Sequence, residues 1–456
     1  MALFNILSSV IVGLVSLFTV PIFSRMLEQG DYGLTGVYTA WVQIFSVIIG
    51  LQVSGSIGSA YANLKESEQD SYQLSVLALA LLSFGITMVL VFFFLAPLSD
   101  ALEMSSSMVI CAVVQSFGTS VIGVFNKRYV FKKQAQANLL LSVAVSVSSS
   151  VLAMILVVIR PGGIAPYLAW ALGFAIPPTL IGLCVSMQLA LKAKAVIRVR
   201  YWVFCLRITL PIILHGLSGV VLAQMGRIGI QHEYGDAMAG VYSIAITVES
   251  VLVALFNALN SAFVPFMYDD LAERTHHSVK MAHFWNYFVL FTGATFAYLM
   301  LGAEAVKVLS PSDYWGAIEV VPFLIVGAYF MFLYSFPVNY EFYAMRTASV
   351  GIGTLLAAIV NVILVMILVP AYGLLGAAVA TMVAYLFLFL FHFLIARFFL
   401  GDGNYPASAF FGGMVAVLFM AALSCLLQDH AVIRWVIALV ILVTLAYRLI
   451  RVRTIF

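Results

Sequence analysis

Glu249 and His215 lie in the middle of apolar runs, where a charged group is costly. Each lies roughly fourteen positions from a turn predicted at 228–237, which at 1.5 Å per residue is about 20 Å deep in the membrane. The two helices joined by that turn run antiparallel, so the side chains could meet at mid-membrane. Such a pair would line a central cavity and respond to protons or cations, because histidine titrates near neutral pH. The alternative is a polar contact that fastens two helices.

Arg25 and Arg227 occupy matching places at the outer ends of two predicted helices, 202 residues apart. The planar guanidinium group of arginine can donate two parallel hydrogen bonds to the oxygen atoms of phosphate. Two arginines related in this way could face a shared cleft and bind a phosphate-bearing substrate. Alternatively, each arginine bonds a helix end or the neighbouring acid, Asp31 or Glu233.

Side-chain amides within the apolar runs form a third group of candidates for a substrate pathway. Amides suit the hydroxyl groups of sugars, and they equally suit hydrogen bonds between helices. These residues are Gln43, Gln115, Gln224, Asn257, Asn260 and Asn361.

A fourth group is expected at the cytoplasmic surface. The segment 127–133 interleaves basic and aromatic residues, and it could attract a pyrophosphate headgroup or anchor the chain on anionic lipid. Its basic members are Lys127, Arg128, Lys132 and Lys133. Glu341 and Arg346 follow near the end of a later run, where they could form an inner gate or a local ion pair.

The motifs of soluble enzymes are missing from the sequence. It contains no GxxxxGK[ST], HExxH, GxSxG or GxGxxG pattern, and its four cysteines and its His276-His277 pair have no metal-ligand spacing. We therefore expect no catalytic residue, no metal and no cofactor. Transport would be driven by a proton or cation gradient, by the membrane potential or by the substrate gradient. No basic domain stands apart that would bind nucleic acid.

The elements that must position these residues are membrane helices. The chain is 64% hydrophobic and only 9% charged, with a mean hydropathy of +1.10, whereas a soluble domain carries about 25% charged residues. Apolar runs of twenty or more residues recur along it, each long enough to cross a bilayer as a helix. The runs predict an all-α polytopic membrane protein of about fourteen transmembrane helices. We expect them at 3–25, 33–60, 72–97, 105–126, 137–160, 164–190, 204–228, 238–266, 282–308, 319–342, 347–369, 372–399, 407–427 and 431–450.

The distribution of basic residues predicts the orientation of these helices. With the N-terminus in the cytoplasm, seventeen of the 22 lysines and arginines fall on the inner side and five on the outer side. Basic residues concentrate in cytoplasmic loops. The sequence therefore predicts that both termini are cytoplasmic.

An internal repeat predicts how the helices are grouped. Residues 25–33 (RMLEQGDYG) match 227–235 (RIGIQHEYG) at Arg, Gln, acid, Tyr and Gly, and each copy is soon followed by Gly-Val-Tyr. Six helices separate the copies, so the two halves insert in the same sense, and transporters bind substrate between such halves. We expect an N-terminal six-helix lobe at 1–191, a cytoplasmic linker at 192–203, a C-terminal six-helix lobe at 204–400 and two additional helices at 401–456.

These features resemble the multidrug/oligosaccharidyl-lipid/polysaccharide (MOP) exporter superfamily, and more closely its Wzx-type flippases of O-antigen and capsule pathways. The resemblance lies in the 6+6 halves, the turn from Pro21-Ile22-Phe23-Ser24-Arg25 to Asp31-Tyr32-Gly33-Leu34, the basic stretch 126–133 and the two-helix tail. It implies a non-enzymatic flippase of the bacterial inner membrane. The implied partners are an undecaprenyl-pyrophosphate-linked oligosaccharide, membrane lipids and other polysaccharide assembly proteins.

Other functions stay open at this point. The first helix has no carboxylate, which argues against drug/cation antiporters with an acidic N-terminal half. A multidrug exporter or an exporter of another lipid-linked precursor, such as lipid II, belongs to the same superfamily. A membrane glycosyltransferase, polymerase or acyltransferase would need a polar loop or paired catalytic groups, and the predicted outer loops are short.

Overall fold

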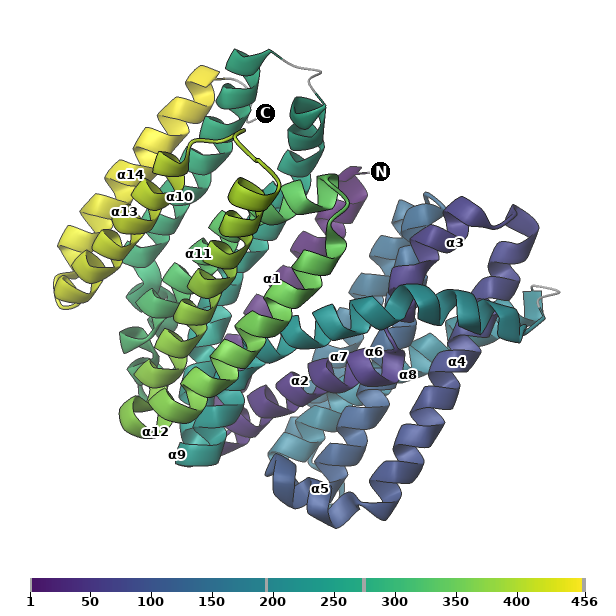
Figure 1. Cartoon of the computed structure of the whole chain (residues 1–456). Helices are drawn as coiled ribbons and strands as arrows, with labels where there is room; N and C mark the ends of the chain where they lie inside the picture. Colours follow the sequence, from purple (N-terminus) through teal and green to yellow (C-terminus); the bar gives the residue numbers. More distant parts are fainter. Residues whose placement is uncertain (1, 193–195, 273–275, 453–456) are drawn as a thin grey trace. The chain divides into compact units, whose positions relative to one another are not determined.

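The computed structural model describes residues 2–192, 196–272 and 276–452 of the chain. Every regular element within these ranges is a helix (Figure 1). The chain divides into two compact units, Met1–Gly240 and Val241–Phe456, and the 73-residue helix α9 contributes to both.

The first unit holds eight helices and the first half of α9. They are α1 (Ala2–Met26), α2 (Gln29–Gly50), α3 (Ile57–Asn63), α4 (Glu66–Phe93), α5 (Leu95–Leu102), α6 (Ser106–Phe131), α7 (Ala135–Ile159), α8 (Pro166–Lys192) and α9 (Val199–Leu271). The second unit holds the rest of α9 and five further helices. These are α10 (His277–Leu309), α11 (Val321–Tyr343), α12 (Thr347–Leu394), α13 (Ala407–Leu426) and α14 (Ala431–Val452).

Short helical segments complete the described structure. They are the 3₁₀ segments η1 (Val53–Ser56), η2 (Pro161–Gly163) and η3 (Ser312–Glu319) and the π-helical segment η4 (Ile395–Phe399).

Eleven of the described helices are long and apolar enough to cross a membrane. Two of them, α9 and α12, each consist of two helices joined at a kink, at Gly235 and at Gly373. With the apolar helix α1 the described spans number about fourteen. The predicted all-helical, polytopic membrane fold is therefore confirmed.

Glycine is required at both kinks. The backbone dihedrals are φ 78°, ψ 179° at Gly235 and φ 56°, ψ −132° at Gly373. A β carbon would clash with the backbone in these conformations, so other residues rarely adopt them. Each glycine thus replaces a loop, and the chain passes from one helix to the next within a single residue.

Helix packing in the first unit relies on close backbone approach. Lipid tails are as apolar as leucine side chains, so membrane helices associate through small residues and not through hydrophobic burial. A Cβ at Gly173 of α8 would lie 2.5 Å from the backbone nitrogen of Ala153 on α7. A Cβ at Gly118 of α6 would lie 2.6 Å from the backbone nitrogen of Thr179 on α8. These glycines let α8 pack directly against both neighbours.

The second unit is packed around an aromatic cluster. Phe284 of α10 stacks on Tyr405 with ring centroids 4.7 Å apart, and both rings contact Phe336 of α11. Phe410 of α13 contacts Phe284 and Phe336 edge-on or tilted. Offset and edge-on pairs of this kind each contribute about 0.5–1.5 kcal/mol beyond area burial. The cluster holds α13 against α10 and α11.

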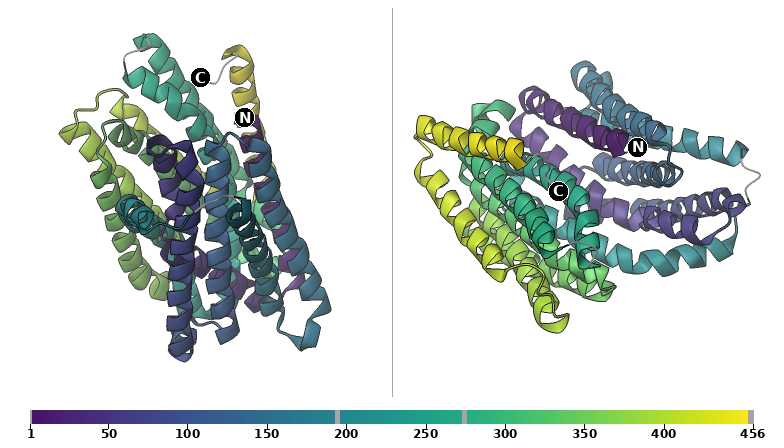
Figure 2. Two further views of the ribbon diagram at one scale, coloured as in Figure 1. Left: turned by 90° about the vertical axis from the view of Figure 1, so that its right-hand side faces the viewer. Right: turned by 90° about the horizontal axis from the view of Figure 1, so that it is seen from above.

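α14 is fastened to α10 by a bidentate ion pair. Arg434 is 2% exposed, and its two terminal nitrogens donate to the carboxylate of Glu304, each at 2.7 Å. The same guanidinium also donates to the backbone carbonyls of Met300 and Leu427. Figure 2 shows α14 lying alongside the preceding helices of its unit. The first of the two additional C-terminal helices is therefore held by aromatic packing and the second by an ion pair in which the arginine is buried.

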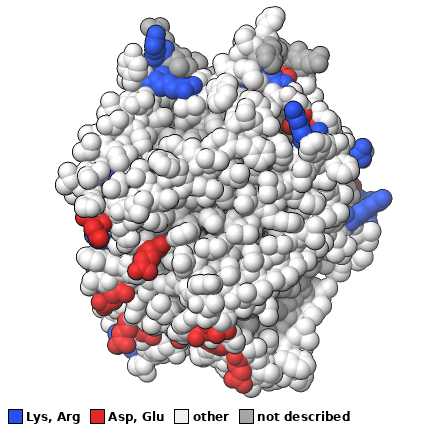
Figure 3. All heavy atoms as spheres, turned by 60° about the vertical axis from the view of Figure 1, so that its left-hand side comes forward, with Lys and Arg blue, Asp and Glu red and all other residues white. Residues whose placement is uncertain are grey.

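The surface carries few charges. Large apolar side chains are exposed along α4, α12 and α14. On the face drawn in Figure 3, basic side chains gather towards one end and acidic side chains mainly towards the opposite end, with uncharged surface between. Exposed apolar surface of this extent is stable only in contact with lipid.

Candidate functional site

Three of the predicted pathway residues form one hydrogen-bonded network in the first unit. Arg227 of α9 is 6% exposed, and its Nη1 donates to the carbonyl oxygen of Gly36 at 2.9 Å and to Oε1 of Gln224 at 3.3 Å. Nε2 of Gln224 donates in turn to Oε1 of Gln43 on α2 at 3.2 Å. The network therefore joins the first half of α9 to α2, with Arg227 and Gln224 buried and Gln43 exposed.

Helical spacing explains why these side chains meet. Gln224 and Arg227 are three residues apart in α9, and residues at this spacing share one face of a helix. Gly36 and Gln43 are seven residues apart in α2, which is two turns along one face. The two polar stripes face each other, so each polar group finds a partner. A buried polar group without one would cost about 1–3 kcal/mol.

The first copy of the sequence repeat is in direct contact with residues 236–240, which follow the second copy. A Cβ at Gly33 of α2 would lie 2.7 Å from the carbonyl carbon of Asp236 and 2.8 Å from the nitrogen of Gly240. A Cβ at Gly240 would lie 2.7 Å from the carbonyl oxygen of Gln29. The first turn of α2 therefore crosses the segment after the Gly235 kink backbone against backbone.

Side chains of the second repeat copy reinforce this crossing. Nε2 of Gln231 donates to the backbone carbonyl of Glu103 at 3.1 Å and to the carboxylate of Asp236 at 2.9 Å. Nδ1 of His232 lies 2.6 Å from the carboxylate of Glu103, which follows α5. Residues 227–240 are thus bonded both to α2 and to the end of α5.

The remaining membrane candidates of the first unit lie apart from this network. Gln115 of α6 accepts a hydrogen bond from the hydroxyl of Tyr38 on α2 at 2.8 Å. Arg25 is exposed, and its Nη1 donates to the carbonyl of Pro21 in its own helix at 2.8 Å. His215 lies in the first half of α9 and is half-buried. The two repeat-related arginines therefore have different surroundings: one is buried and bonds a neighbouring helix, and the other bonds its own helix.

The candidate residues of the second unit also have different partners. Glu249 lies within electrostatic range of Tyr298 and Tyr385. Its pairing with His215, which belongs to the first unit, stays a prediction. Asn260 accepts a hydrogen bond from Asn339 of α11 at 3.2 Å.

Two further amides of the second unit differ in burial. Asn257 is exposed on α9. Asn361 of α12 is completely buried, and neither polar atom of its side chain has a hydrogen-bond partner among the described residues. Of the three predicted amides in this unit, Asn260 is hydrogen-bonded, Asn257 is exposed and Asn361 is buried.

The basic segment at the C-terminal end of α6 contains both ion-paired and exposed basic side chains. The carboxylate of Asp70 on α4 lies 2.7 Å from Nη1 of Arg128 and 3.2 Å from Nζ of Lys132. Lys127 and Lys133 are exposed and make no ion pair in the described structure. Two of the four predicted headgroup residues thus share one carboxylate and keep one net positive charge between them, and the other two are exposed.

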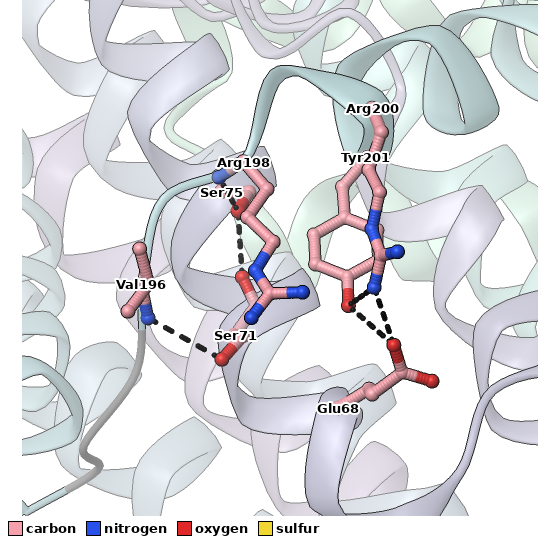
Figure 4. Close-up of polar contacts among 7 residues, drawn as sticks. All are labelled: Glu68, Ser71, Ser75, Val196, Arg198, Arg200 and Tyr201. Atoms are coloured by element: carbon pink, nitrogen blue, oxygen red, sulfur yellow. Dashed lines mark hydrogen bonds and ion pairs between the residues drawn. The ribbon is translucent and has the colours of Figure 1, made fainter.

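The segment that leads into α9 is clamped onto α4 (Figure 4). The backbone nitrogens of Val196 and Arg198 donate to the hydroxyls of Ser71 and Ser75 at 3.3 and 3.0 Å. The linker predicted at 192–203 is therefore bound to the first unit over its second half. Residues 193–195 of this linker lie outside the described residues.

Side chains extend the clamp to the N-terminal end of α4. Arg200 and the hydroxyl of Tyr201 both donate to the carboxylate of Glu68, and the two donors are bonded to each other (Figure 4). Trp202 donates from Nε1 to the carbonyl of Ser75 at 2.7 Å.

Glu341 is part of a buried cluster that sequence reasoning did not find. One carboxylate oxygen lies 2.6 Å from Nδ1 of His392, and the other accepts a hydrogen bond from the hydroxyl of Ser349. The side chains of Glu341 and His392 are both completely buried. Arg346 contributes only backbone atoms: its nitrogen donates to the carbonyl of Glu341 at 2.8 Å, and its carbonyl accepts from the hydroxyl of Ser349 at 2.6 Å, while its side chain is exposed. The position of His392 within an apolar run was a signal, because an ionisable side chain there is costly.

Comparison with known proteins places the chain in a family. Residues 2–269 match the family model described as polysaccharide biosynthesis protein. Protein 1 of the Lsg locus of Haemophilus influenzae is 28% identical over 163 residues. That alignment covers 34% of this chain, and the chain spans 38% of the length of this curated relative.

Solved structures show the same fold. The lipid II flippase MurJ in an inward-closed conformation superposes with a TM-score of 0.74 at 14% identity, covering 99% of each chain. An inward-facing multidrug resistance MATE family transporter of the MOP superfamily gives a TM-score of 0.64 at 14% identity, covering 88% of this chain and 100% of its own. A MOP superfamily transporter from Pyrococcus furiosus gives 0.56 at 18% identity, covering 87% and 94%. The chain therefore belongs to the polysaccharide biosynthesis protein family, and it has the fold of the flippases and transporters of the MOP superfamily.

Proposed function

We propose that this protein moves lipid-linked oligosaccharides across the bacterial inner membrane by alternating access. The substrate class is an undecaprenyl-pyrophosphate-linked repeat unit of O-antigen, capsule or exopolysaccharide. The observation that carries the proposal is the match of residues 2–269 to the polysaccharide biosynthesis family in a chain made of membrane-spanning helices. The sequence also lacks nucleotide-binding motifs, which suits movement of a finished unit better than its synthesis.

The polar network of the first unit suits such a substrate. The guanidinium of Arg227 can bind a phosphate oxygen, and the amides of Gln224 and Gln43 can exchange their mutual hydrogen bond for sugar hydroxyls. Lys127 and Lys133 are exposed and could attract the pyrophosphate headgroup before entry. In this proposal the two termini are cytoplasmic, and the substrate passes between the six-helix lobes predicted at 1–191 and 204–400.

Deletion of the gene in its host tests the proposal. Lipid-linked repeat units should accumulate on the cytoplasmic face of the membrane, surface polysaccharide should fall, and the wild-type gene should restore it. Normal surface polysaccharide in the deletion strain would contradict the proposal. Increased drug sensitivity in that strain would instead support the second candidate, a multidrug exporter, which the shared fold of the MATE transporters favours.

Arg227→Gln is expected to reduce surface polysaccharide strongly, whereas Arg25→Gln should have little effect. Arg227 is buried and bonds α2, so its loss removes charge-assisted hydrogen bonds of about 1.5–3 kcal/mol. Arg25 is exposed and bonds only its own helix. Polysaccharide is measured in the deletion strain at matched protein levels. Equal losses in the two variants would show that both arginines act on the substrate, and wild-type export by Arg227→Gln would remove this residue from the pathway.

A further inference from the structure

The second unit contains a closed carboxylate–imidazole site whose role the proposed function does not explain. Glu341 lies near the end of α11, Ser349 in the first turn of α12 and His392 in its last turn, so the site joins three helix ends. The carboxylate of Glu341 contacts Nδ1 of His392 at 2.6 Å and accepts a hydrogen bond from Ser349. Both titratable side chains are 0% exposed.

The charge balance of this site depends on a single proton. With Nε2 of His392 protonated and one further proton shared between Oε1 of Glu341 and Nδ1 of His392, the pair has no net charge, whichever of these two atoms carries the shared proton. Without it, a carboxylate and a neutral imidazole leave one negative charge in a fully buried position. An uncompensated buried charge costs several kcal/mol even after the protein relaxes.

The neighbouring side chains offer little positive charge to balance the carboxylate once the proton is released. The ring of Tyr334 lies 5.0 Å from that of His392 and is uncharged near neutral pH. Two arginines, Arg346 and Arg397, flank the site in sequence, but both side chains are exposed, and Arg397 donates to a backbone carbonyl.

His392 also has one ring nitrogen without a partner. Its Nε2 is buried and has no hydrogen-bond partner among the described residues. Gly353 makes room for this ring, since a Cβ there would lie 2.7 Å from a ring carbon of the adjacent Phe391 and closer still to Nε2. Three residues after His392 the helix changes to the π-helical segment η4, a distortion common at functional sites.

We propose that Glu341 and His392 form a proton-binding site that couples the proposed export to a proton gradient. The closed arrangement of the three helix ends binds one proton more than an arrangement in which the ends separate and water reaches the carboxylate. Proton release therefore favours separation, and proton binding favours closure. Arg346 and Arg397 lie at the end of the unit predicted to face the cytoplasm, so the proton is released to that side. The coupling rests on the proposed function, but proton-linked closure does not.

The closure can be tested on the purified protein without substrate. Val350 is 2% exposed and follows Ser349, so a Val350→Cys thiol is protected while the site is closed. The background carries serine at the four native cysteines. Between pH 6 and pH 8.5 the maleimide labelling rate should rise about tenfold more in this protein than in the same protein carrying Glu341→Gln. That second variant has no carboxylate to hold the shared proton, and it corrects for ionisation of the thiol itself. Equal pH dependence in the two proteins would overturn the proposal.

The coupling is tested in proteoliposomes loaded with lipid-linked oligosaccharide extracted from the deletion strain. A pH gradient should accelerate wild-type export, and Glu341→Gln or His392→Gln should export at a rate that no longer depends on the gradient. A merely structural pair would lower the amount of folded protein and leave the gradient dependence unchanged.

A second carboxylate–imidazole pair provides the matched control. Nδ1 of His283 lies 3.1 Å from the carboxylate of Asp270, and the histidine is 14% exposed. His283→Gln should keep the gradient dependence, and its loss in this variant alone would move the site to Asp270. Export that ignores the gradient in the wild type would refute the coupling alone, whereas no export at all would refute the proposed function and leave the labelling result standing.

Discussion

Gly33→Ala is expected to abolish export, whereas Gly30→Ala, one helical turn earlier, should leave it intact. A Cβ on Gly33 would lie 2.7 Å from the carbonyl carbon of Asp236 and 2.8 Å from the nitrogen of Gly240, and closer still to the Asp236 oxygen. These are backbone atoms, which cannot rotate away as a side chain can. At Gly30 the nearest atom is Cβ of Asp236 at 3.9 Å, an ordinary contact.

The cost of the Gly33 substitution should exceed that of ordinary overpacking. Extra methyl groups in a packed core cost about 1–3 kcal/mol, and here whole segments must separate. Surface polysaccharide in the deletion strain and thermal stability of the purified protein measure the effect. Gly30→Ala is the matched control, because it makes the same chemical change in the same helix. Full export by Gly33→Ala would show that the close contact between α2 and residues 236–240 is not needed.

Glu304→Leu is expected to destabilise the second unit by about 1.5–3 kcal/mol, the usual contribution of hydrogen bonds to charged groups, because Arg434 is buried whereas Glu304 is 24% exposed. Arg434 is 2% exposed and would keep its charge without the carboxylate it now binds through two hydrogen bonds. The double variant Glu304→Leu/Arg434→Met should be more stable than Glu304→Leu alone, because it removes both charges.

Thermal unfolding in detergent measures these differences. Arg448→Met is the control, since Arg448 also joins α14 to α10 but through one long hydrogen bond, 3.4 Å to Asn286. It should change stability by less than about 1 kcal/mol. If the double variant is no more stable than Glu304→Leu, the penalty does not come from the unpaired charge.

Hydropathy was sufficient to predict the fold class because lipid forces the backbone into helices. The kink at Gly235 lies inside the turn predicted at 228–237, and Gly373 lies next to the predicted boundary between 347–369 and 372–399. The type of connection was not predicted. Whether a glycine continues a helix or breaks it depends on its φ and ψ angles, and Gly33 and Gly235 occupy equivalent places in the repeat with different conformations.

For the candidate functional site, the sequence predicted which polar residues take part but not which of them bond to each other. Gln43, Gln224 and Arg227 were chosen one by one because polar groups in apolar runs need partners, and the structure bonds them to each other. The pair Glu341–His392 spans 51 residues with no characteristic spacing, so no motif could reveal it. Partners of this kind are determined by which helix faces meet, and apolar sequences specify that poorly.

The clamp of Figure 4 has a consequence for the order in which the protein is assembled during translation. Its hydrogen bonds join residues 123 to 133 positions apart, so α4 is synthesised and inserted long before its partners at 196–201 leave the ribosome. Until then the carboxylate of Glu68 and the hydroxyl oxygens of Ser71 and Ser75 lack the donors that they bond in the complete protein. A nascent chain ending at residue 192 therefore lacks part of its own first unit, and release of that unit from the insertion machinery should wait for α9.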